Sequence, residues 1–228
     1  MSHSDFTPPV NSLPPVVVVL FFAIVLPEIA FTLGASGLIG GPEAVGWRLA
    51  ALQDYAFSGT LFDWMWTNGR WPPEHLQRFV TYAFVHQAFT GTLFAAVFVL
   101  ALGKMVGETM GQVAVAILFF GGSIFGAFAY GLLLDDPTWL IGGFPAAYAL
   151  IGGYSFLMWL RLDAAGQQQI RAFSLIAMLM GLQLLFGVFF GPSTLWVADL
   201  AGFVFGFCAS VLLVRGGLAR ILRSLRRD

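Results

Sequence analysis

Six long apolar runs constrain this chain more than any other feature of its sequence. A helix needs about 20 apolar residues to cross the hydrocarbon core of a bilayer. The runs are Pro15 to Ala35, Phe79 to Leu102, Gln112 to Leu134, Phe144 to Leu160, Ala172 to Phe190 and Leu195 to Val214. We therefore predict an all-α integral membrane protein, a bundle of six transmembrane helices in one domain of residues 1–228.

The scarcity of charge supports this interpretation. Only 10% of the residues are charged and 58% are hydrophobic, whereas a soluble domain carries about 25% charged residues. The net charge of −1 gives no indication of nucleic-acid binding. Cys208 is the only cysteine, which excludes an internal disulfide and a cysteine-based zinc site, and we expect its thiol to be buried. Nothing in the sequence indicates a cofactor or a metal.

The placement of Lys and Arg predicts the orientation. Basic residues follow the last run and flank two of the short connections: Arg215, Arg220, Arg223, Arg226, Arg227, Lys104, Arg161 and Arg171. Only Arg48, Arg70 and Arg78 fall on the opposite side. The positive-inside rule then places both termini in the cytoplasm. The segment 1–14 has no Lys or Arg, so we expect a retained first helix. The basic tail 215–228 fits either an amphipathic surface helix or a solvated stop-transfer tail.

The first loop, residues 37–77, is long and rich in tryptophan. Trp64, Trp66 and Trp71 lie close together, and tryptophan favours the boundary between lipid and water. We expect the loop to be partly helical, to lie against the outer leaflet and to end at Pro72 and Pro73, because proline cannot continue a helix.

Three motifs occur in a fixed order on the second, fourth and sixth runs. They are "RFVTYAFVHQAFTGTLFAAVFVLALGKMVGETMG" from Arg78, "GGFPAAYALIGGY" from Gly142 and "ADLAGFVFG" from Ala198. Together they resemble the rhomboid intramembrane serine proteases, and so does the long loop after the first run. The resemblance implies a six-helix rhomboid-like bundle with a membrane-associated first loop.

The resemblance also assigns positions to the chemistry of that family. The nucleophilic serine position is Phe144, and the histidine base position on the sixth helix is Asp199. The two oxyanion positions on the second helix are Gly91 and Ala95. A phenyl ring cannot act as a nucleophile, and serine itself needs an adjacent base. We therefore predict that the chain is not an enzyme, with no catalytic residues.

Other motif positions are retained and imply structural roles. Arg78, Thr81 and His86 are expected to hold the first loop against the second helix through polar contacts, because buried polar groups normally have partners. Gly202 and Gly206 are expected to let the sixth helix approach the fourth near Gly152 and Ala149. Glu108 fits the pattern at the end of the second helix, displaced by one position.

Two acids within the apolar runs need separate interpretation. Asp199 either binds a polar group of a partner helix or carries a proton, or it is protonated or hydrogen-bonded to a neighbour. Glu28 could in principle form a proton path with Asp199, which would indicate a carrier.

These positions predict a rhomboid-like pseudoprotease of the bacterial inner membrane. Its expected partners are transmembrane helices of other membrane proteins, together with membrane lipids. It would bind them as a quality-control or assembly factor or as a stable subunit of a larger membrane complex. The alternatives are an intramembrane protease with relocated catalytic residues and a proton-coupled carrier that uses Glu28 and Asp199.

Overall fold

A computed structural model describes residues 12–134, 136–191 and 193–214. The basic tail 215–228 and most of the N-terminal segment 1–14 lie outside the described residues, so the predictions for them stand as predictions.

Five helices of the described chain are long and apolar enough to cross a membrane. They include α1 (Pro15–Ala35), α6 (Phe89–Met110), α7 (Gln112–Leu133) and α10 (Trp196–Leu213). The fifth span, Gln169–Phe189, combines the short helix η3 (Gln169–Phe173) with most of α9 (Ser174–Phe190). These findings show a multi-pass membrane protein.

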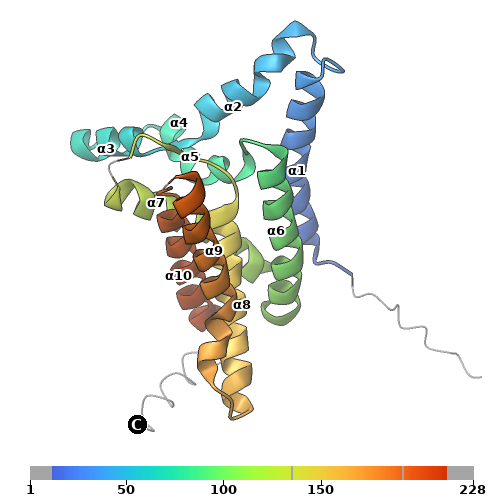
Figure 1. The fold of residues 1–228 in the computed structure, drawn as a ribbon, viewed down its shortest axis with the longest axis vertical. Coiled ribbons are helices and arrows are strands. Elements are labelled where there is room, and N and C mark those ends of the chain that lie inside the picture. The colour runs from blue at the N-terminus through green and yellow to red at the C-terminus, as the bar shows by residue number, and fades with distance from the viewer. Residues whose placement is uncertain (1–11, 135, 192, 215–228) are drawn as a thin grey trace, which may run out of the picture.

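The remaining long helix, α8 (Phe144–Ala164), is less apolar but the most enclosed. Its 21 residues would extend about 30 Å at 1.5 Å per residue. Thirteen of them are buried, and α8 packs against α6, α7 and α10 (Figure 1). Because protein rather than lipid surrounds it, α8 tolerates the Tyr, Ser and Gly residues that lower its hydropathy.

The predicted second span, Phe79 to Leu102, is wrong at both ends, since α6 continues to Met110. Residues 79–88 do not belong to α6, which begins ten residues later than expected, at Phe89. They form α5 (Arg78–Thr81), the short helix η2 (Tyr82–Phe84) and an extended connection. Tertiary contacts explain the break, because the Tyr82 carbonyl accepts a hydrogen bond of 2.9 Å from the Gly142 amide. His86 therefore lies in a bend beside α8 and not on a membrane helix.

The first loop is largely helical, as the sequence predicts. It contains η1 (Pro42–Gly46), α2 (Trp47–Tyr55), α3 (Gly59–Asn68) and α4 (Pro73–Leu76), which lie together at one end of the bundle (Figure 1). We call this the loop end. Trp64, Trp66 and Trp71 are each between 41% and 55% exposed, which suits side chains at a lipid–water boundary.

A small sheet ties this loop to the segment before α8. Strand β1 (Phe57–Ser58) pairs antiparallel with β2 (Trp139–Leu140), with Phe57 opposite Leu140. Beneath the loop lies a separate core of buried residues: Phe57, Phe62, Met65, Phe79, Tyr82, Ala127, Tyr130, Leu140 and Ala198. The loop is therefore packed against the helices and helps to fix where α8 begins.

Glycines bring α8 and α10 into backbone contact. A Cβ atom at Gly206 would overlap the carbonyl oxygen of Ala149, and one at Gly202 would overlap that of Pro145. From the other side, a Cβ atom at Gly152 would overlap the carbonyl oxygen of Phe203. Small residues allow such close approach in lipid, where packing drives helix association.

Helix α9 is the least enclosed of the long helices. Ile176 is its only buried side chain among those described, and leucines and phenylalanines along its length are exposed. On α10, Cys208 is also exposed rather than buried as expected, because it lies on the side of the helix that faces away from the glycine contact.

Candidate functional site

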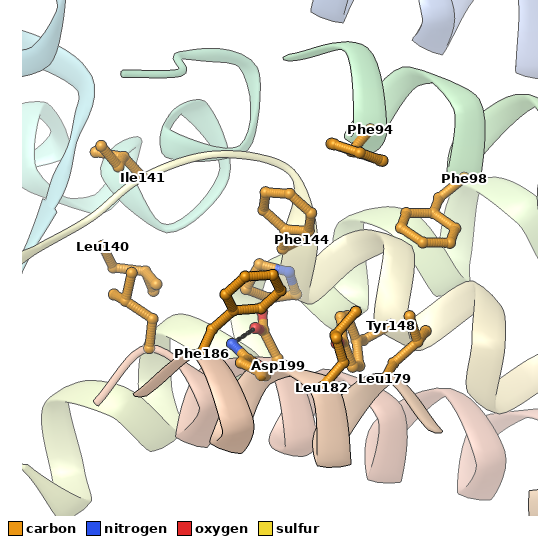
Figure 2. Close-up of a pocket in the computed structure, with 13 residues that line it drawn as sticks. Phe94, Phe98, Leu140, Ile141, Phe144, Tyr148, Leu179, Leu182, Phe186 and Asp199 are labelled. Atoms are coloured by element: carbon orange, nitrogen blue, oxygen red, sulfur yellow. Dashed lines mark hydrogen bonds between the residues drawn. The ribbon is translucent and has the colours of Figure 1, made fainter. Parts of the chain in front are cut away.

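A cavity of about 580 Å³ lies among α6, α8, α9 and the start of α10. Its volume is within the range of ligand pockets in proteins. Figure 2 shows its lining, which consists of Phe94, Phe98, Leu140, Ile141, Phe144, Pro145, Tyr148, Leu179, Leu182, Gln183, Phe186, Leu195 and Asp199. The predicted nucleophile and base positions, Phe144 and Asp199, therefore lie in the same cavity.

Asp199 and Gln183 place a polar pair inside this apolar lining. Asp199 is 4% exposed and lies in the first turn of α10. Its Oδ2 accepts a hydrogen bond of 2.9 Å from Nε2 of Gln183, on α9 (Figure 2). The other amide atom, Oε1 of Gln183, is buried and has no hydrogen-bond partner among the described residues. Sequence reasoning missed Gln183, although it is a lone amide in an otherwise apolar run.

A tight turn at Gly142 and Gly143 directly precedes α8. Gly142 has a φ of 87°, a left-handed conformation that favours glycine. The next amide, of Gly143, donates a hydrogen bond of 3.1 Å to Nε2 of His86. Phe144 then begins the helix, and Pro145 occupies its first turn, where a missing N–H leaves no helix hydrogen bond unmade.

Gly91 and Ala95, the predicted oxyanion positions, lie next to this turn. A Cβ atom at Gly91 would approach the His86 ring to 3.8 Å, and one at Gly143 would approach Ala95 to 3.7 Å. Neither residue carries a hydrogen-bond donor on its side chain. The predicted oxyanion positions thus lie beside the turn that precedes α8, and their side chains provide no group for oxyanion binding.

Two of the retained motif residues contact the first loop. Nη1 of Arg78 donates to the Ala56 carbonyl at 2.9 Å, and the Thr81 hydroxyl donates to the Tyr55 carbonyl at 3.1 Å. Glu108 lies 3.9 Å from Lys104, one turn earlier on the same exposed face of α6. These residues lie away from the cavity, which agrees with structural roles.

Glu28 belongs to a separate, fully paired network near the loop end. Its carboxylate accepts two hydrogen bonds from Arg48, of 2.6 and 2.8 Å, and others from Thr32 and Thr92. Nη1 of Arg48 also donates to the His86 carbonyl at 2.8 Å. The hydrogen bond with Glu28 raises the pKa of Arg48, so the guanidinium stays charged. Sequence reasoning placed Arg48 in the loop without recognising its partner.

Comparison with known families confirms the family resemblance. The sequence model of the Rhomboid domain matches residues 73–216. The chain belongs to the rhomboid family. A comparison with curated proteins gives no match. The rhomboid match covers α4 to α10 and therefore the whole cavity lining, whereas Glu28 and Arg48 both lie before it.

The stability of this rhomboid protein should fall in acid because of His86, which lies in the bend before α6. Burial lowers the pKa of His86 to about 4, below the value of about 6.5 expected in an unfolded chain. The unfolded state then binds the proton first, so stability is full above pH 6.5 and falls as the pH drops towards 4. We expect a loss of about 2 kcal/mol between pH 7 and pH 5.

Thermal unfolding in detergent at the two pH values measures this loss. The matched control is His86→Gln, which keeps an acceptor for the Gly143 amide but cannot titrate. An equal fall in Tm for the variant and the unaltered protein would show that another group is responsible.

Proposed function

We propose that this rhomboid-family protein is a non-catalytic pseudoprotease that binds transmembrane segments of partner proteins. It would act as a quality-control or assembly factor or as a stable subunit of a membrane complex. We further propose that α8 is the sixth and central span, and that the protein resides in a bacterial inner membrane with both termini in the cytoplasm.

The observation that carries the proposal is the identity of the two residues at the predicted nucleophile and base positions, which lie in one cavity. Acyl transfer by a serine enzyme needs a hydroxyl next to a base, and the cavity instead holds the ring of Phe144 and a carboxylate. The Asp199 carboxylate accepts a hydrogen bond from an amide rather than from a hydroxyl. Pro145, which follows Phe144, has no backbone N–H to donate to an oxyanion.

The buried serines supply no replacement nucleophile. The hydroxyls of Ser123 and Ser210 donate to carbonyls of their own helices, of Phe119 and Gly206 respectively. Ser155 is buried without a hydrogen-bond partner. In the described ranges, no serine hydroxyl is hydrogen-bonded to a histidine or to a carboxylate, so relocated proteolytic chemistry gains no support.

Treatment of the purified protein with a fluorophosphonate probe is expected to give no covalent labelling, because no serine hydroxyl among the described residues is hydrogen-bonded to a histidine or a carboxylate. An active rhomboid protease in the same detergent serves as the positive control. Labelling that disappears when one serine is replaced by alanine would contradict the non-catalytic proposal.

The carrier alternative is also disfavoured by the geometry. Glu28 forms a salt bridge with Arg48, and Asp199 accepts a hydrogen bond from Gln183. The two acids belong to different networks, and Glu28 is not part of the cavity lining. A continuous proton path would need groups between these networks.

Binding of a transmembrane segment can be tested by photo-crosslinking. A photoreactive phenylalanine analogue at position 94 would face the cavity, whereas one at position 93 would lie at the same depth outside the lining. Phe94 is 59% exposed and Leu93 is 49% exposed, so the two sites are matched in accessibility. We expect a synthetic transmembrane helix in proteoliposomes to crosslink preferentially at position 94. Equal crosslinking at both positions would argue against a binding site in the cavity.

A further inference from the structure

Two helices on opposite sides of the cavity each contribute a stripe of apolar side chains. Within each stripe, successive side chains are about one helical turn apart. On α6 they are Phe94 and Phe98, and on α9 they are Leu179, Leu182 and Phe186. Positions separated by three or four residues lie on one face of a helix. Two facing stripes of this kind form a groove that accepts side chains from the apolar face of a third helix. This spacing favours a helix over a small ligand as the occupant.

Among the described residues, Oε1 of Gln183 is a buried side-chain acceptor in the groove that has no donor. The Asp199 carboxylate accepts the amide N–H of Gln183, which fixes the orientation of that amide and leaves its Oε1 free. A buried acceptor that lacks a partner is costly. Because Asp199 and Oε1 of Gln183 are both acceptors, the group that complements them must be a donor.

The positions of Gln183 on α9 and of Asp199 on α10 show how deep this acceptor lies in the membrane. Gln183 lies seven residues before Phe190, where α9 ends, which corresponds to about 10 Å along the helix. Asp199 lies in the first turn of α10, which starts at the same end of the bundle. The acceptor therefore lies in the half of the membrane next to the loop end.

We propose that Gln183 and Asp199 form a polar recognition site for a partner transmembrane helix that carries a side-chain carboxamide or hydroxyl about 10 Å from its loop-side end. This inference rests on the proposed function and specifies the class of partner. The donor would bind Oε1 of Gln183 while the apolar residues around it fill the groove. Because α9 is weakly enclosed, it can adjust to the incoming helix.

The test uses proteoliposomes and three synthetic polyleucine transmembrane peptides. One carries a single asparagine in the half next to the loop end, one carries it in the opposite half, and one carries only leucine. The protein carries the photoreactive group at position 94. Interhelical hydrogen bonds are worth about 0.6 to 1.7 kcal/mol, so we expect about three- to eighteenfold more crosslinking to the first peptide.

The matched variant is Gln183→Leu/Asp199→Leu, which removes both polar groups together and leaves no unpaired acid. We expect it to fold, to crosslink all three peptides and to lose the preference. A preference that persists in this variant, or equal crosslinking of all three peptides to the unaltered protein, would overturn the polar site while leaving the proposed binding function intact.

Two other outcomes are also informative. Failure of every peptide to crosslink in either protein would overturn the proposed binding function itself. Retention of a phospholipid at position 94 that no peptide displaces would show that the groove is a lipid site, and it would overturn the inference.

Discussion

Replacement of Gly206 by alanine is expected to cost about 4 kcal/mol or more of the free energy of unfolding, an exceptional loss for the addition of one methyl group. The added Cβ would overlap the carbonyl oxygen of Ala149, and backbone atoms cannot rotate away as a side chain can. Helices α8 and α10 would have to separate, which would also loosen the contacts at Gly202 and Gly152. Since packing holds helices together in lipid, little would compensate.

The effect can be measured as the loss of a folded peak in gel filtration and as a fall in Tm. Gly181→Ala is the matched control, because a Cβ atom at that position on α9 meets nothing within 4 Å. We expect this control to unfold at or slightly above the temperature of the unaltered protein, since alanine favours a helix over glycine. Two variants with the same Tm would show that α8 and α10 are not in backbone contact.

Replacement of Glu28 by alanine is expected to cost about 3 to 5 kcal/mol, because it leaves a largely buried guanidinium without its partner. The side chain of Glu28 is 3% exposed and that of Arg48 is 25% exposed. The variant also loses the hydrogen bonds that Thr32 and Thr92 donate to the carboxylate. Denaturant unfolding in mixed micelles would measure the loss.

The double variant Glu28→Met/Arg48→Met tests the cause. Replacing both charges by apolar side chains is often neutral or stabilising, so we expect much of the lost stability to return. The carbonyl of His86 would still lack the donor that Arg48 supplies, so recovery should be incomplete. A double variant as unstable as Glu28→Ala would show that the ion pair is not the dominant interaction.

The helices that lipid surrounds were predictable from sequence, because their boundaries carry local signals. Pro15 and the Gly34 to Gly37 region delimit α1, and Gly111 separates α6 from α7. Glycine and proline also mark the start of α8, at Gly142 and Pro145. Hydropathy and chain-breaking residues were sufficient at these boundaries.

The break before α6 was not predictable in the same way. Residues 79–88 contain neither proline nor glycine, although His86 and Gln87 interrupt the apolar run shortly before α6 begins. Their conformation depends on contacts with the turn at Gly142 and Gly143, which are more than 50 residues away. Such a boundary is set largely by tertiary structure, and local hydropathy marks it only through His86 and Gln87.

The candidate site was predicted in part. The motif order pointed to Phe144 and Asp199, and the structure brings both into one cavity. The role of Gln183 could not be recognised, because a single amide in an apolar helix does not reveal which helix it faces. The pairing of Glu28 with Arg48 was missed because the sequence placed one in a membrane span and the other in a loop.

The pairing of Glu28 with Arg48 has a consequence for how the protein is made. The acid precedes its partner by 20 residues, so at a synthesis rate of about 5 to 20 residues per second the nascent α1 waits about 1 to 4 s for Arg48 to leave the ribosome. During this interval the translocation machinery must hold a span with an uncompensated carboxylate. Release into the bilayer would become favourable only once the loop helix α2 has been synthesised, which would couple the insertion of α1 to the synthesis of α2.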